Sequence, residues 1–87
     1  MSAFLIESPH TKEQCLHALD EVLAEGKEVL ARYRFGCAAG DHTGYVMVDA
    51  ENERAAREIV PVDLRSAARV IPLREFTPAE IAQYHAK

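Results

Sequence analysis

Hydrophobic positions along this chain repeat with two different periods, and the period predicts which kind of element each segment forms. The first apolar run, residues 3–6, ends shortly before a Ser-Pro pair and predicts a short strand with both faces covered. A helical period comes next, opened by a capping box of Thr11 and Gln14 and stopped by Gly26. The apolar stripe of this helix consists of Cys15, Leu16, Leu19, Val22 and Leu23.

The period changes to two after residue 31. Residues 27–31 fit either a further helical turn or the approach to a strand, whereas residues 32–37 alternate and predict a second strand. Turn residues at 38–41 predict a hairpin, and residues 42–49 then alternate as a third strand. In the second strand, one face is expected to carry Tyr33, Phe35 and Cys37. In the third strand, one face carries Gly44, Val46 and Val48, and the opposite face carries Tyr45 and Met47.

Three further elements are predicted in the last part of the chain. Asn52 can cap a second, shorter helix, which Pro61 prevents from continuing. Residues 70–73 predict a fourth strand, at the edge of the sheet because Pro72 has no N–H to donate. A second capping box at residues 77–80, with proline at the first helical position, opens a C-terminal helix.

This order of elements is β-α-β-β-α-β with a helix at the end. Right-handed crossovers turn it into a ferredoxin-like α+β sandwich, with the helices on one face of a four-stranded antiparallel sheet. We predict a single domain over residues 1–87. Apolar residues on the other sheet face need a cover, since large exposed apolar patches are unusual on monomers, and a second copy of the chain would supply it. The sequence therefore predicts a homodimer.

Composition narrows the classes of partner and location. The chain has a net charge of −4 and no cluster of Lys and Arg, which argues against a nucleic-acid partner. No apolar run approaches the roughly 20 residues of a membrane span, and the first eight residues lack the basic region of a signal peptide. We therefore expect no membrane partner and a cytoplasmic location. In that reducing compartment Cys15 and Cys37 are expected as thiols, metal ligands or redox groups rather than as a disulfide.

The segments from residue 32 to residue 73 resemble the dimeric α/β-barrel superfamily, which contains muconolactone isomerase and YciI-like proteins. The shared features are an aromatic strand, a Gly-Asp-His turn, a Tyr-Val-Met-Val strand, an Ala-rich helix and a Val-Ile-Pro-Leu strand. Residues 8–11, Gly36-Cys37 and residues 40–45 are similar to a set of small bacterial proteins without an assigned activity. The superfamily includes isomerases, haem-handling enzymes and oxygenases. The resemblance therefore implies a ferredoxin-like fold and a dimeric barrel and leaves the reaction open.

The predicted topology gathers reactive residue types at one end of the domain. The first and second strands run parallel, so their C-terminal ends, the start of the first helix and the hairpin lie together. The residues collected there are His10, Thr11, Cys15, Cys37, Asp41 and His42. We expect the nearby helix N-terminus to lower the pKa of the Cys37 thiol and make it reactive.

Two interpretations of this cluster compete. As a metal site, His10, Cys15, Cys37 and His42 offer two imidazoles and two thiolates to zinc, copper or nickel. As a ligand pocket, His42 serves as the acid–base group, oriented by Asp41, while His10, Thr11 and Cys37 bind the ligand.

These interpretations lead to three functions. The first is a small-molecule-binding homodimer with its pocket around His42, and whether it also catalyses an isomerase- or oxygenase-like reaction stays open. The second is a metal-binding protein ligated through Cys37, His42 and His10. The third is a structural or regulatory module without catalysis. Arg32 and Arg34 are interpreted as surface charges or a carboxylate clamp, and His17 as part of a solvated helix face.

Overall fold

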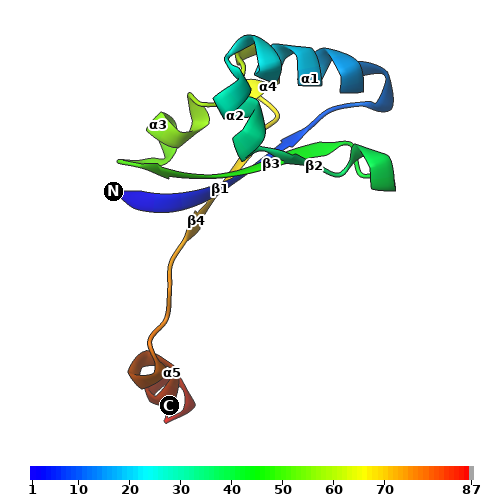
Figure 1. The fold of residues 1–87 in the computed structure, drawn as a ribbon. Helices are drawn as coiled ribbons and strands as arrows, with labels where there is room; N and C mark the ends of the chain where they lie inside the picture. Colours follow the sequence, from blue (N-terminus) through cyan, green and yellow to red (C-terminus); the bar gives the residue numbers. More distant parts are fainter. Residues whose placement is uncertain (87) are drawn as a thin grey trace.

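Four antiparallel strands form one sheet in the computed structural model, which describes residues 1–86 (Figure 1). The strands are β1 (Ser2–Pro9), β2 (Arg34–Phe35), β3 (Thr43–Ala50) and β4 (Arg69–Leu73). Their order across the sheet is β2-β3-β1-β4, with β1 paired to both β3 and β4. This α+β arrangement is compatible with the predicted ferredoxin-like fold.

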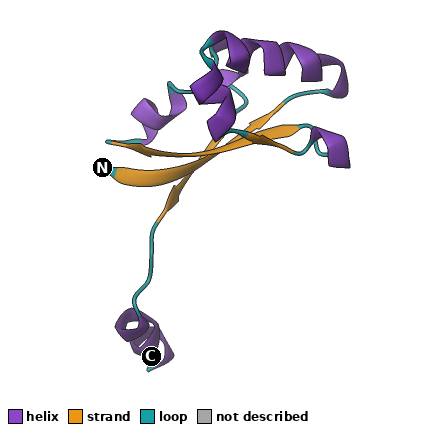
Figure 2. Cartoon of the chain, viewed as in Figure 1, coloured by secondary structure: helices purple, strands orange, loops and turns teal. Residues whose placement is uncertain are grey.

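Short helices connect the strands and cover one face of the sheet (Figure 2). They are the 3₁₀ turns η1 (Lys12–Gln14) and η2 (Cys37–Ala39) and the helices α1 (Cys15–Ala24), α2 (Lys27–Arg32), α3 (Glu53–Arg57), α4 (Val62–Arg65) and α5 (Pro78–His85). Helix α5 is the exception, because it stands apart from the sheet at the end of an extended segment (Figure 1). Within residues 1–86 no helix is long and apolar enough to cross a membrane.

The core lies between the sheet and helices α1 to α4. Alternate residues of β1 and β3 point into it, as their period of two requires. Its members are Phe4, Ile6, Ala18, Val22, Tyr33, Val46, Val48, Ala50, Ala56, Val60, Leu64, Ala68 and Val70. Ile6, Val22 and Val60 are fully buried, and each contributes about 1.5–3 kcal/mol relative to an exposed side chain.

The other face of the sheet is left open in the single chain. Strand register places Leu5 opposite both Met47 and Ile71, so these three side chains form an apolar row across the sheet. Glu7 lies in the next row, between Tyr45 and Arg69. The prediction that both faces of the first strand are covered is therefore wrong for the isolated chain.

The second strand is shorter than predicted. Residues 27–32 form helix α2, which settles the ambiguity of that segment, and the N–H of Tyr33 donates to the Leu30 carbonyl to end it. Only Arg34 and Phe35 pair with β3, and Cys37 lies in the turn η2 instead. The alternation from residue 32 to residue 37 was misleading because one helical turn and one tight loop occupy its two ends.

The second predicted helix is shorter than expected, and a helix that the sequence did not predict follows it. Asn52 caps α3 through a 2.8 Å bond from the Ala55 N–H, as predicted, but α3 ends at Arg57 and a separate helix α4 begins after Pro61. Proline cannot continue one helix, yet its fixed φ suits the start of another.

The buried face of α1 also differs from the predicted stripe. Ala18 and Val22 are buried against the sheet, whereas Leu16 and Leu23 are exposed. The buried positions are four residues apart and therefore lie on one side of the helix, whereas the two leucines lie on other sides.

Candidate metal centre

The first part of the site is His10, the residue that follows the end of β1. The His10 N–H donates to the His42 carbonyl over 2.9 Å, which fixes the two histidine backbones side by side. Their imidazole rings meet edge to face with centroids 6.2 Å apart. Two segments 32 positions apart in the chain are thereby held together at one end of the sheet.

The start of the first helical segment brings in Cys15. The Thr11 side chain accepts from the Gln14 N–H, and the Gln14 side chain accepts from the Thr11 N–H, so the predicted capping box is present. It anchors the turn η1, which leads directly into Cys15 at the beginning of α1. Thr11 thus has a structural role in placing a thiol at the site.

Two glycines shape the loop that carries Cys37 and His42. A side chain at Gly36 would put its Cβ 2.7 Å from the Asp41 carbonyl oxygen, closer than real Cβ atoms approach. Gly40 has φ of 89°, in the left-handed region that favours glycine, and closes the turn with a bond to the Cys37 carbonyl. The tight loop brings Cys37 back toward the His42 end of the hairpin.

Four side chains meet at this point. The candidate ligand atoms of His10, Cys15, Cys37 and His42 all lie within 4.8 Å of one another, and all four residues are half-buried. The Cys37 sulfur is 2.7 Å from the Cys15 sulfur and 3.5 Å from His10 Nε2. The structure therefore brings together the four residues that the sequence nominated as ligands.

These distances can be compared with a tetrahedral zinc site. Zn–S bonds of about 2.3 Å and Zn–N bonds of about 2.0 Å put neighbouring ligand atoms about 3.3–3.8 Å apart. The contact between Cys37 and His10 already fits this range. The two sulfurs are free thiols, farther apart than the roughly 2.05 Å of a disulfide, and they would separate by about 1 Å to hold a metal ion.

Two imidazole nitrogens at the site lack a partner. Nδ1 of His10 and Nδ1 of His42 are buried without a hydrogen bond among the described residues. Buried polar atoms are normally satisfied, and leaving one unsatisfied costs about 1–3 kcal/mol. A metal ion would remove this cost only for an imidazole that binds it through Nδ1, and His10 faces Cys37 with Nε2.

The Asp41 carboxylate is hydrogen-bonded to a residue of β3. Its Oδ2 accepts a 2.5 Å hydrogen bond from the Tyr45 hydroxyl. This bond is the main cause that holds the pKa of Asp41 below its usual value, and it raises the pKa of Tyr45. The carboxylate thus accepts from Tyr45, and among the described residues no hydrogen bond from His42 to Asp41 is present. The tyrosine, expected only as packing, was missed.

The expected activation of Cys37 is also wrong for the thiol as it stands. The adjacent Cys15 thiol raises the pKa of Cys37, with desolvation as the second cause. The start of α1 contributes its own thiol to the site, and this thiol is the first cause of the raised pKa of Cys37.

The larger hollows of the molecule lie elsewhere. A cavity of about 480 Å³ on the open sheet face is lined by Leu5, Arg32, Arg34, Tyr45, Val46 and Met47. Arg32 belongs to α2 and Arg34 to β2, so they do not share a strand face, yet both border this cavity. His42 lines neither it nor the two further cavities on this side of the described chain.

His17 lies away from the cluster. It is exposed, and its Nε2 contacts Glu21 at 2.5 Å, with Asp63 3.8 Å away. The three groups form a second set of possible ligand atoms, but the set is on an open helix surface. The predicted solvated position of His17 is confirmed, although it has acidic neighbours.

Two buried hydroxyls were not singled out from the sequence. Ser8 Oγ and the Tyr33 hydroxyl have no hydrogen-bond partner within residues 1–86. Ser8 lies at the end of β1 that leads to His10. Ser8 could have been singled out from the sequence, because it is a polar residue at a core-facing position of an otherwise apolar strand.

Comparison with protein-family models, with curated proteins and with solved structures finds no match for this chain.

Proposed function

We propose that this protein binds one transition-metal ion through His10, Cys15, Cys37 and His42. The observation that carries the proposal is the convergence of two imidazoles and two thiols from three separate segments within 4.8 Å.

The donor set favours zinc over the alternatives. Two thiolates and two neutral imidazoles suit Zn²⁺, which prefers four tetrahedral N and S ligands. Cu⁺ shares the preference for thiolate and is the next choice. Nickel and Cu²⁺ prefer square-planar nitrogen and oxygen ligands, and the cluster does not contain that set.

The number of ligands favours binding over catalysis. Catalytic zinc sites keep one position for water or substrate and therefore use three protein ligands, whereas structural sites use four. With all four side chains engaged, the ion would tie the start of α1 to the β2–β3 hairpin. Half-buried ligands also leave the ion accessible to exchange. We therefore assign the protein to metal binding, in a reducing compartment such as the cytoplasm that keeps both thiols free.

A second proposal concerns assembly. The resemblance to dimeric α/β barrels and the open sheet face both support a ferredoxin-like protomer that pairs with a second copy. The row of Met47, Leu5 and Ile71 would be the centre of that contact. The alternative function is small-molecule binding in the cavity beside Arg32 and Arg34. Because both guanidinium groups are positively charged, an anionic ligand would suit this cavity.

Metal analysis of the purified, untagged protein tests the assignment. We expect about one equivalent of zinc per chain under reducing conditions, and Co²⁺ in its place should show the visible bands of a tetrahedral thiolate site. Cys37→Ser and His42→Ala should each lower the metal affinity at least about tenfold.

The matched controls are histidines outside the cluster. His85→Ala, on α5, should leave the affinity unchanged, and His17→Ala should do so unless the exposed set with Glu21 and Asp63 takes the ion. A blank in the metal analysis, together with no Co²⁺ bands, would contradict the proposal and favour the small-molecule function.

A further inference from the structure

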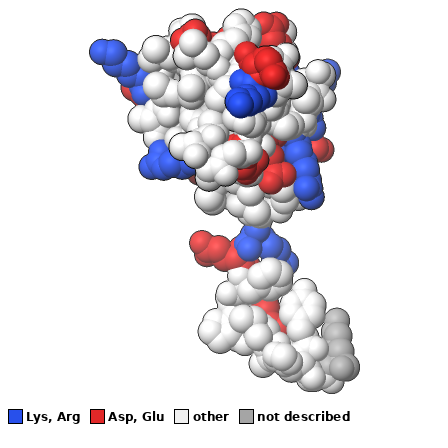
Figure 3. Space-filling view, turned by 90° about the vertical axis from the view of Figure 1, so that its right-hand side faces the viewer, with Lys and Arg blue, Asp and Glu red and all other residues white. Residues whose placement is uncertain are grey.

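Helix α5 stands away from the rest of the chain. Figure 1 and the view at right angles in Figure 3 both show it as a separate lobe on a narrow neck. The lobe carries two large apolar side chains, Phe76 and Ile81, that are about half exposed. An isolated helix of eight residues is too short to be stable alone in water, so α5 needs a surface to pack on.

The overall dimensions lead to the same conclusion. The chain exposes 6207 Å², about 1,100 Å² more than the roughly 5,100 Å² expected for a folded monomer of this size. Its radius of gyration is 15.5 Å, against about 12 Å for a compact domain of this length. The excess surface exceeds the roughly 800 Å² that each partner buries in a standard protein interface.

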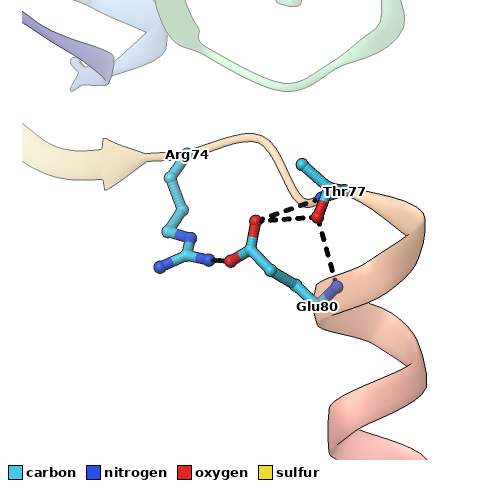
Figure 4. A network of polar contacts seen from close by, with 3 residues as sticks. All are labelled: Arg74, Thr77 and Glu80. Atoms are coloured by element: carbon cyan, nitrogen blue, oxygen red, sulfur yellow. Dashed lines mark hydrogen bonds and ion pairs between the residues drawn. The ribbon is translucent and has the colours of Figure 1, made fainter.

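The neck has a defined shape (Figure 4). Thr77 and Glu80 form the predicted capping box, with the Thr77 side chain accepting from the Glu80 N–H. Arg74 pairs with Glu80 and lies 4.4 Å above the ring of Phe76. These contacts bind residues 74–77 to the start of α5.

The open sheet face offers the matching surface. Its apolar row of Met47, Leu5 and Ile71 continues into a cavity of about 620 Å³ that Ala3, Met47 and Leu73 help to line. The neck leaves β4 at the border of this cavity, where Arg74 and Glu75 are also lining residues. Each chain therefore has a C-terminal segment with exposed apolar side chains and a sheet face with an apolar row, and neither covers the other.

We propose that two copies of this chain exchange their C-terminal helices, so that α5 of each packs on the open sheet face of the other. A reciprocal exchange covers both apolar surfaces in both chains and closes as a two-fold dimer with no surface left for further growth. This inference rests on the proposed homodimer and adds to it the segment that makes the contact. It does not depend on metal binding.

The oligomeric state of charge-introducing variants gives the first test. By sedimentation equilibrium the full-length protein should be a dimer, and Ile81→Glu and Met47→Glu should each raise its dissociation constant at least about tenfold, since a charge would be buried in the contact. Val62→Glu is the matched control, because Val62 is an exposed valine on α4, on the opposite side of the sheet. It should leave the dimer unchanged.

A cross-linking experiment identifies which chain α5 contacts. A photoreactive benzophenone in place of the Tyr84 ring, in a mixture of ¹⁴N- and ¹⁵N-labelled chains, should join light to heavy chains at residues of β1, β3 or β4. Products joining α5 only to its own chain would mean that the helix folds back, and would overturn the exchange. A dimer that survives Ile81→Glu and gives no cross-link from α5 would overturn the exchange while leaving the homodimer. A monomer at micromolar concentration would overturn both.

Discussion

Tyr33 illustrates how burial alters the chemistry of one side chain in this protein. It is 4% exposed, it stacks on Phe35 with ring centroids 5.6 Å apart, and its hydroxyl has no partner in residues 1–86. Desolvation is the main cause that raises the pKa of Tyr33 to about 12, and the charge of Glu25 adds to it. The phenol is therefore held neutral well above the pH at which an exposed tyrosine ionises.

This shift predicts a loss of stability at high pH. The pKa in the folded state lies above the unfolded value of about 10, so the contribution is complete below pH 10 and is lost as the pH rises through about 12. A shift of about two units corresponds to a decrease of about 2–3 kcal/mol in the free energy of unfolding. Denaturant titrations from pH 9 to pH 12 should show a shallower decrease for Tyr33→Phe than for the unmodified protein.

Tyr84→Phe is the control for that measurement, made in the Ile81→Glu background so that the proposed helix exchange does not bury Tyr84, which is exposed on α5 of the single chain. It should match the Ile81→Glu variant over the whole range. Equal pH dependence in the Tyr33→Phe variant and the unmodified protein would show that the buried phenol has no part in alkaline unfolding.

Helix starts show how short segments of sequence determine single elements. Both capping boxes are present, and each satisfies backbone N–H groups through residues three positions apart. The helices that they open differ in their surroundings. Thr11 leads into a helix that is packed on the sheet and carries Cys15, whereas Thr77 leads into the detached α5.

The difference predicts unequal effects of the same substitution. Thr11→Ala should lower the free energy of unfolding by about 1 kcal/mol, which is several degrees in melting temperature for a domain this small. Thr77→Ala should have a smaller effect on the melting temperature of the single chain, because α5 is not part of its core. Thermal denaturation by circular dichroism compares the two, and equal losses would contradict the ranking.

The candidate metal centre joins distant parts of the whole molecule. Its four side chains occur at positions 10, 15, 37 and 42, so an ion bound there would close loops that the unfolded chain leaves open. Such an ion binds the folded state in preference to the unfolded one. Metal binding and folding should therefore be linked.

We expect zinc to stabilise the protein in proportion to its occupancy. At a free concentration 100 times the dissociation constant the gain should be about 2.7 kcal/mol, and a chelator should remove it. In Cys37→Ser the same zinc concentration should raise the melting temperature far less. An increase of the same size in that variant would assign the stabilisation to another site, such as the exposed His17 cluster.

Several features of the fold and site could be predicted from the sequence because they depend on neighbours a few residues apart. The two capping boxes, the Asn52 cap and the alternation of β3 were all predicted correctly. The cluster of His10, Cys15, Cys37 and His42 was also predicted, because the order of strands places their segments at one end of the sheet. Where alternation overlapped a helix end, as at residues 32–37, the local pattern was insufficient.

Tertiary structure decided the features that depend on contacts between distant segments. Packing against the sheet chose Ala18 and Val22 as the buried face of α1, although the leucines are more hydrophobic. The fold of the hairpin brings the Tyr45 hydroxyl to the Asp41 carboxylate, to which it donates a hydrogen bond. The proximity of Cys15 raises the pKa of Cys37. The amphipathic pattern of α5 depends only on its own residues. Its position away from the core depends on the rest of the fold, because a helix can pack wherever an apolar surface is left open. Sequence periodicity therefore determined which residues form each element, and the distances between elements determined which of those residues interact.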